Sequence, residues 1–342
     1  MPIEGWLTRH FLPLCIGSGL LLFALHFTVH PYEDLRGAGR SSDRDEALEI
    51  AVGRLLSGEN PYYPQNPNAG PLSVLPGGIL LALPFVIAGK VGWINVVAIT
   101  LLMWVLHRYG RSSRDILTVT LLAWFASAAG AYEFVSGGDL IANGIYVALG
   151  FLWVWKEWSA THLRRATAFA SALFLGVAVA SRANFPLLCP LMIAALWKQA
   201  GWQRAGGFAA ITGLSSVSLI AGFYLIDPAA FTPLLSRGKL AAGDASGWTS
   251  TFLAGFTLAL VAACSFRLIF SKSIALPRTL FSCCALVLAA PVVGVLLMDS
   301  LRVGSLHLGF LSDRFGLMWI PFALFGSDGE KRETGKQEPD QA

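Results

Sequence analysis

The stretch SSDRDEALEIAVGRLLSGENPYYP, from Ser41 to Pro64, is the acidic element around which an otherwise apolar chain is organised. Within it, Ser42 and Asp45 have the spacing of a capping box, and so do Asp43 and Glu46. This pattern predicts that a helix begins close to these residues. Acidic residues in a first turn are also common because they offset the positive end of the helix dipole, so catalysis does not follow from the pattern alone.

The predicted helix is amphipathic and lies within a polar segment, residues 30–71. Four apolar side chains share one of its faces: Leu48, Ala51, Val52 and Leu55. Gly58 suits the position just past the end of the helix, and Asp45 falls at the border between its two faces. A short amphipathic helix of this kind is expected to lie flat on a membrane surface.

The composition predicts an all-α polytopic membrane protein. The chain has 342 residues, of which 55% are hydrophobic and only 13% charged, and its mean hydropathy is +0.60. A soluble domain carries about a quarter charged residues. The net charge of +4 is explained by Lys and Arg that flank the membrane, and no basic patch indicates a nucleic-acid partner. Five cysteines lie in apolar stretches, without the spacing of a disulfide framework or a metal site: Cys15, Cys189, Cys264, Cys283 and Cys284.

Apolar runs divide the chain into candidate membrane segments. The first, Phe11–Val29, lacks a signal-peptide cleavage site and is predicted to be an uncleaved anchor. The second, Pro71–Gly89, is broken by prolines and glycines and is predicted to be a re-entrant or surface segment. Further runs cover residues 91–106, 116–131, 140–155, 166–181, 184–197, 206–226, 249–266, 279–298 and 306–326. Residues 1–326 are thus expected to form a single transmembrane domain, and residues 327–342 a disordered cytoplasmic tail.

The basic loops predict how the chain is oriented in the membrane. Lys and Arg residues gather in the loops 107–115, 156–165, 198–204 and 266–278. Such loops favour the cytoplasmic side. All four lie on that side only if Pro71–Gly89 does not cross, which gives about ten crossings, both termini in the cytoplasm and residues 30–71 outside. The alternative has eleven crossings and an outer C-terminus.

Several charged side chains fall on the predicted outer side. Arg182 lies between two apolar runs, where an arginine is costly unless it faces a polar cavity or extends its guanidinium to the interface. Asp139 is either a functional acid or the N-cap of the helix that follows it. Arg237 and Lys239 also fit a solvated loop, and His307 an interfacial position, because no second metal ligand is spaced beside it.

These features together resemble the GT-C glycosyltransferases, membrane enzymes that use polyprenyl-phosphate-linked sugars. In that family a first transmembrane helix is followed by a large extracytoplasmic loop with one or two catalytic acids. The similar stretches are Asp43-Arg44-Asp45-Glu46-Ala47, Gly58-Glu59-Asn60-Pro61-Tyr62, the segment from Pro71 to Pro76, Asp139, Ser181-Arg182 with Pro186, and Arg314-Phe315 with Pro321.

The resemblance implies a GT-C-like bundle of about ten transmembrane helices with a large first extracytoplasmic loop. It further implies a hexosyltransferase, mannosyltransferase-like, at the outer side of a bacterial inner membrane. The donor would be a polyprenyl-phosphate sugar and the acceptor a glycan, lipid or protein. Asp45 is the first candidate for the general base and Asp43 the second. The implied phosphate-binding cations are Arg182, Arg314, Arg237 and Lys239, and the implied substrate-binding residues are Asp139, Tyr62, Tyr63, Trp248 and His307.

The chemistry that such a transfer needs is modest. A lipid phosphate is already a good leaving group, so the enzyme needs chiefly a base for the acceptor hydroxyl and cations for the departing phosphate. Direct displacement would invert the anomeric centre. No cofactor is required, and use of a divalent cation is left open because clustered carboxylates bind one without a distinctive motif. The competing interpretations are a multi-pass transporter or lipid-linked-sugar flippase, and a non-catalytic envelope assembly protein.

Overall fold

In the computed structural model the described residues form helices joined by turns and irregular segments. The described residues are Trp6, 9–34, 44–62, 72–109, 116–117, 120, 128–234, 248–272, 276–305 and 315–327. No strand occurs among them, and the predicted all-α fold is confirmed.

The helices of the N-terminal half are α2 (Phe11–Asp34), α3 (Arg44–Leu56), α4 (Pro76–Ile87), α5 (Trp93–Arg108), α7 (Ala128–Val135), α8 (Leu140–Trp158) and α9 (Arg165–Val179). Those of the C-terminal half are η1 (Phe185–Leu188), α10 (Cys189–Ala200), α11 (Trp202–Ile226), η2 (Thr232–Leu234), α13 (Trp248–Phe270), α14 (Leu276–Val303), η4 (Gly316–Met318) and α16 (Ile320–Gly326).

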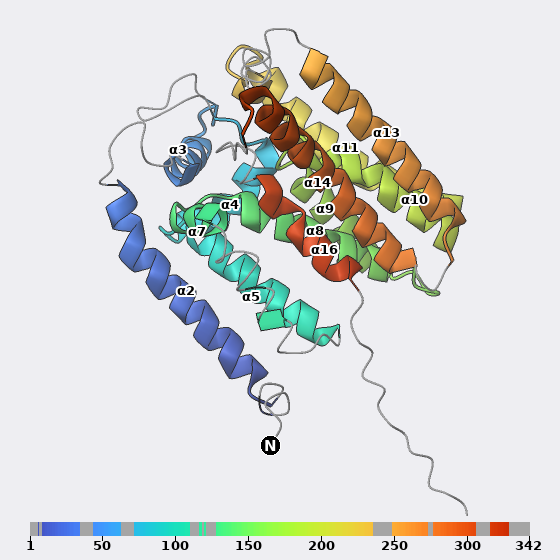
Figure 1. Cartoon of the computed structure of the whole chain (residues 1–342), viewed down its shortest axis with the longest axis horizontal. Coiled ribbons are helices and arrows are strands. Elements are labelled where there is room, and N and C mark those ends of the chain that lie inside the picture. The colour runs from blue at the N-terminus through green and yellow to red at the C-terminus, as the bar shows by residue number, and fades with distance from the viewer. Residues whose placement is uncertain are drawn as a thin grey trace, which may run out of the picture.

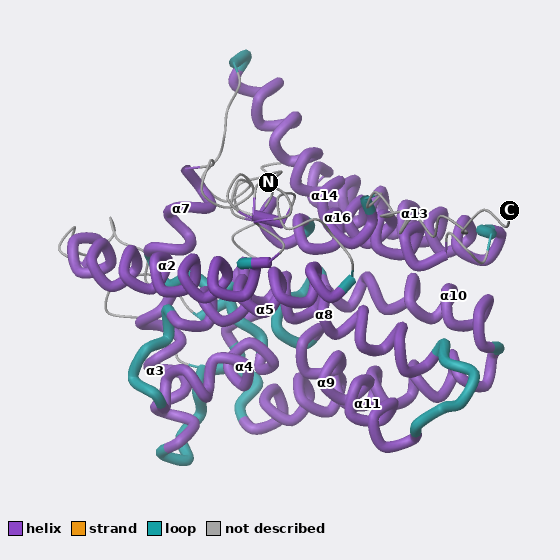
Figure 2. The backbone as a smooth tube through the Cα atoms, turned by 90° about the horizontal axis from the view of Figure 1, so that it is seen from below, coloured by secondary structure: helices purple, strands orange, loops and turns teal. Residues whose placement is uncertain are grey.

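The helices are stacked in layers. Figure 1 shows α2 beside α5 on one flank and α13 on the opposite flank, with α8, α9 and α14 in the middle. Helix α14 also packs against α13. In the view of Figure 2, α13, α14 and α16 form one layer, α5, α8 and α10 the next, and α4, α9 and α11 the last. Helix α8 therefore occupies the centre, which agrees with the fact that fifteen of its nineteen residues are buried.

Three of the described helices are long and apolar enough to cross a bilayer. They are Trp202–Ile226, Thr251–Phe270 and Leu276–Met298. Six shorter apolar helices accompany them, and one of these is Pro76–Ile87, whose 12 residues are fewer than the seventeen or so that a span requires. The length and composition of these helices make the chain a membrane protein. That the chain crosses the membrane about ten times, and that the segment Pro71–Gly89 does not cross it, stay predictions.

Helix α3 confirms the predicted helix and its faces but not its surroundings. It begins at Arg44, and Gly58 follows its end with a φ of 74°, which favours glycine. Leu48, Ala51 and Val52 are fully buried in a core cluster that includes residues of α4 and α5. The apolar face of α3 is therefore packed against other helices, and the position of α3 at a membrane surface stays a prediction.

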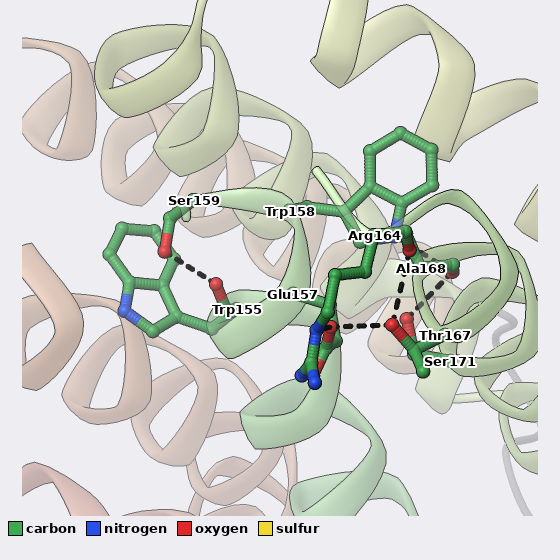
Figure 3. A network of polar contacts seen from close by, with 8 residues as sticks. All are labelled: Trp155, Glu157, Trp158, Ser159, Arg164, Thr167, Ala168 and Ser171. Carbon is green, nitrogen blue, oxygen red and sulfur yellow. Dashed lines mark hydrogen bonds and ion pairs between the residues drawn. The ribbon is translucent and has the colours of Figure 1, made fainter. Parts of the chain in front are cut away.

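Two of the basic loops meet at one end of the central helices. In the α8–α9 loop, Arg164 donates two hydrogen bonds to Glu157, at 2.6 and 3.2 Å, and Thr167 donates a third at 2.7 Å (Figure 3). Arg204, near the start of α11, donates to backbone oxygens of the same loop, among them that of Trp158 at 3.1 Å. The α8–α9 and α10–α11 loops thus lie side by side.

Helix α16 runs along α8 in the same direction. A Cβ atom placed on Gly144, near the start of α8, would lie 2.9 Å from the Cα of Met318, just before α16. Further along both helices the rings of Phe151 and Phe322 meet edge to face, with centroids 5.7 Å apart. The last residues of α16 are therefore directed toward the basic end of α8.

The other two basic loops approach the end of α16. Tyr109, which follows α5, has its ring 6.3 Å from that of Phe325. Ser282, in the second turn of α14, donates a hydrogen bond of 3.3 Å to the backbone oxygen of Gly326. All four basic loops therefore have described residues at one end of the bundle, the arrangement that a shared cytoplasmic side requires.

Candidate functional site

The site is built around the tight turn between α7 and α8, residues 136–139. Gly137 has a φ of 66°, in the left-handed region where a side chain is strained, and it lets the chain reverse between the two helices. Every residue of this turn is buried. The turn lies at the start of α8, opposite to the basic end, and the 19 residues of α8 separate the two ends by about 28 Å.

Asp139 closes this turn and holds a buried ion pair. Its Oδ1 pairs with the Nη2 of Arg182, and its Oδ2 accepts a hydrogen bond of 2.6 Å from Asn143. Asp139 precedes α8 and is thus its N-cap by position, as the sequence predicts, but its carboxylate binds Arg182 and Asn143 rather than the backbone N–H groups of the helix.

Glu133 provides the cap that Asp139 does not. It lies in α7, is fully buried, and its Oε1 accepts a hydrogen bond of 3.0 Å from the backbone N–H of Leu140. This role was not predicted. The signal was a lone carboxylate in the apolar run AYEFV, directly before a Ser-Gly-Gly turn.

Asn95 ties α5 to the same turn and was also missed. Its Nδ2 donates a hydrogen bond of 2.6 Å to the backbone oxygen of Gly138, and its Oδ1 accepts one of 3.2 Å from the N–H of Ala142. Both bonds are buried. A single amide in the otherwise apolar run WINVV was the only sequence signal.

Asp45, the first candidate for the base, lies against the turn. A Cβ atom on Gly137 would stand 2.9 Å from the Cβ of Asp45 and 3.4 Å from its Oδ2. Asp45 is only 5% exposed, although it lies in the first turn of α3. The structure therefore brings Asp45 and Asp139 to the same buried turn.

Arg182 reaches the turn from the end of α9. It is 6% exposed and follows Ser181, whose backbone oxygen accepts a hydrogen bond of 3.2 Å from Leu75. The N–H of Gly77 donates a second hydrogen bond, of 3.0 Å, to the backbone oxygen of Ala180, the residue before Ser181. The start of α4 is thus fixed to the segment that carries the arginine. The low exposure of Arg182 excludes a side chain that simply extends into water.

Three buried polar atoms of this cluster have no hydrogen-bond partner among the described residues. They are the Nε of Arg182, the Oδ1 of Asn143 and the Oγ of Ser181. Buried polar groups are paired in most proteins, and leaving one unpaired costs about 1–3 kcal/mol. These atoms are an N–H donor, a carbonyl acceptor and a hydroxyl, so a water or ligand that both donates and accepts hydrogen bonds would suit them. We call Asp45, Asn95, Glu133, Asp139, Asn143, Ser181 and Arg182 the polar cluster.

Tyr62 lies outside this cluster, in a hydrophobic environment. It is 2% exposed, its hydroxyl donates a hydrogen bond of 3.2 Å to the backbone oxygen of Val74, and its ring lies 4.8 Å from that of Phe231. Burial raises the pKa of this phenol above its ordinary value, so it stays protonated. In this position its ring contacts protein side chains rather than an open binding surface.

The remaining predicted site residues are not placed. Trp248 is the first residue of α13, but its side chain lies outside the described part of the chain. The others lie outside the described residues altogether: Asp43, Tyr63, Arg237, Lys239, His307 and Arg314. Within the described ranges no group of three or more His, Cys, Asp or Glu side chains is arranged to hold a metal ion, so use of a divalent cation stays a prediction.

Comparison of the chain with protein-family models, with curated proteins and with solved structures finds no match.

Proposed function

We propose that the chain is an integral-membrane glycosyltransferase that moves a hexose from a polyprenyl-phosphate donor to an acceptor outside the cytoplasm. The observation that carries the proposal is the convergence of Asp45, Asp139 and Arg182 on one buried turn. These residues come from α3, the start of α8 and the end of α9. All three were predicted from the sequence, as a base, a substrate contact and a phosphate-binding cation.

The polar cluster has the groups that this reaction requires. Asp45 would accept the proton of the acceptor hydroxyl, and its low exposure would keep bulk water from competing with that hydroxyl. Arg182 would stabilise the leaving phosphate through N–H groups not used by Asp139, and its Nε has no partner among the described residues. Asp139 would hold the guanidinium in place, so it is a positioning residue for the donor.

The place of the cluster supports an outer active site. The four basic loops gather at the opposite end of the bundle, and α8 spans a distance close to the roughly 30 Å of a hydrocarbon core. If the basic end faces the cytoplasm, the polar cluster lies near the outer boundary of the membrane. Lipid-linked sugars present their phosphate and sugar at such a boundary.

The test compares Asp45→Asn with Glu49→Gln. Both changes remove one carboxylate from α3, but Glu49 is exposed whereas Asp45 is buried. Membranes that hold equal amounts of each protein, and that also supply the acceptor, are incubated with radiolabelled polyprenyl-phosphate mannose, and transfer of the sugar from the lipid is measured. We expect Asp45→Asn to lower the rate by about 10²–10⁴-fold and Glu49→Gln to leave it unchanged. Equal rates for both variants, or no use of this donor by the wild type, would overturn the proposal.

A second function, transport, is favoured by a separate observation. Glu133 caps α8, but it is also fully buried beside the turn at 136–139, and buried ionisable residues of membrane domains often mark an ion pathway. The transporter interpretation predicts uptake or exchange of a solute by sealed vesicles without any cleavage of a lipid-linked sugar. The same donor assay therefore separates the two functions.

A further inference from the structure

A cavity at the basic end of the bundle has no part in the proposed reaction. It has a volume of about 250 Å³ and lies between the end of α13, the start of α14 and the end of α16. These three helices form one layer (Figure 2). The polar side chains that line it are those of Arg267, Arg278, Thr279 and Ser282.

The lining of this cavity suits an anion. Two guanidinium groups and two hydroxyls face it, and no carboxylate is among the described residues that line it. Arginine offers planar pairs of N–H donors that match phosphate oxygens, and hydroxyls add further donors. Both arginines are exposed, so each can meet a ligand without a change in the helices.

The surface next to the cavity suits acyl chains. Leu286 lines the cavity and is 49% exposed, and Phe266 and Phe270 on α13 are 65% and 69% exposed. Both helices that carry these side chains are long and apolar enough to cross a bilayer. An occupant would therefore have its charged group at the arginines and its apolar part along the exposed leucine and phenylalanines.

We propose that this cavity binds the phosphate headgroup of an anionic phospholipid. Arg267 and Arg278 hold the phosphate, Thr279 and Ser282 form the wall of the cavity beside it, and the acyl chains lie along Leu286. Basic pockets between transmembrane helices bind such headgroups, because guanidinium groups near the surface attract the anionic lipids of the leaflet. The bound lipid links α13 to α14 and stabilises that pair of helices. This inference does not depend on the proposed glycosyl transfer.

The test measures lipid binding to the purified full-length protein in a neutral detergent. Thermal unfolding is followed while phosphatidylglycerol, phosphatidylcholine or inorganic phosphate is added, and native mass spectrometry counts the lipid retained. We expect phosphatidylglycerol alone to raise the unfolding temperature and to stay bound. Arg267→Gln/Arg278→Gln should weaken this binding by about thirtyfold, since each charge near the surface contributes a factor of about five.

The matched control is Lys198→Gln, which removes an exposed charge at the same end of the bundle but outside the cavity. It should bind phosphatidylglycerol as the wild type does. Equal stabilisation by phosphatidylcholine, or unchanged binding by the double variant, would overturn the proposal. A response to inorganic phosphate equal to that for phosphatidylglycerol would show a site for free anions and would likewise overturn it.

Discussion

The ion pair between Asp139 and Arg182 is buried, so each charge needs the other as its partner. Both side chains are almost completely buried, at 2% and 7% exposure, and the two residues are separated by 43 positions in the chain. A charge buried without its partner is costly, whereas a neutral replacement of both partners is often tolerated. This asymmetry yields a test of what the pair does.

We expect Arg182→Ala to destabilise the protein by about 3–5 kcal/mol, because the carboxylate of Asp139 then stays buried and unpaired. The double variant Asp139→Ala/Arg182→Ala should recover a large part of that loss. Thermal unfolding in detergent of both single variants and the double variant gives the coupling energy. Additive effects of the two single changes would show that the pair contributes nothing as a pair.

Gly137 sets the position of Asp45, and Gly58 provides a control for it. Both glycines have positive φ, 66° and 74°, but only at Gly137 would an added methyl group lie within 4 Å of Asp45. An alanine in this backbone region costs about 1–2 kcal/mol at either site. We therefore expect a loss of stability for both variants, larger for Gly137→Ala because its methyl group also collides with Asp45, and a loss of donor cleavage only for Gly137→Ala. Equal cleavage by the two variants would show that the contact with Asp45 has no functional role.

Among the helices, the contact between the start of α4 and the end of α9 fixes the position of Arg182. The backbones approach so closely that a Cβ atom on Gly77 would overlap the carbonyl oxygen of Val177. Two backbone hydrogen bonds, of 3.0 and 3.2 Å, join the same segments. A rigid backbone contact is a precise way to place a charged side chain at a buried turn.

We expect Gly77→Ala to lower stability by about 1–3 kcal/mol, since the added methyl group meets backbone atoms that cannot rotate away. The control is Gly53→Ala in α3, where nothing lies within 4 Å and alanine should stabilise the helix by about 0.5–1 kcal/mol. Thermal unfolding of the two variants checks both signs. Stabilisation by Gly77→Ala would mean that α4 can shift away from α9 without cost.

The elements of the fold were largely predictable, and their polar contacts were not. Periodicity and capping signals placed α3, and apolar runs located the helices of the central bundle. Asp45, Asp139 and Arg182 were conspicuous because charges are rare in this chain. Glu133 and Asn95 were missed because their roles depend on the backbone of the turn at 136–139, to which no local pattern points. The packing of α3 against other helices was not predicted because an apolar helix face looks the same whether lipid or protein covers it.

At the scale of the whole molecule, the sequence allows two topologies, with ten or with eleven membrane crossings. The structure has exposed positions at which chemical labelling can distinguish the two. Ser57, after α3, and Thr161, in the α8–α9 loop, are both exposed and lie on opposite sides in the predicted topology. Ala88 is exposed at the end of α4. The five native cysteines lie in apolar stretches, where a charged thiol reagent has poor access.

We expect a membrane-impermeant thiol reagent, added to intact cells, to label Ser57→Cys and Ala88→Cys but to label Thr161→Cys only after the cells are lysed. With ten crossings, the segment Pro71–Gly89 returns to the outer side and the basic loops face the cytoplasm. With eleven crossings, Ala88 would be inside and Thr161 outside, so the labelling of these two positions would be reversed. That reversed pattern would also move the α8–α9 loop to the outer side, and the polar cluster at the other end of α8 would then face the cytoplasm instead of the outer boundary.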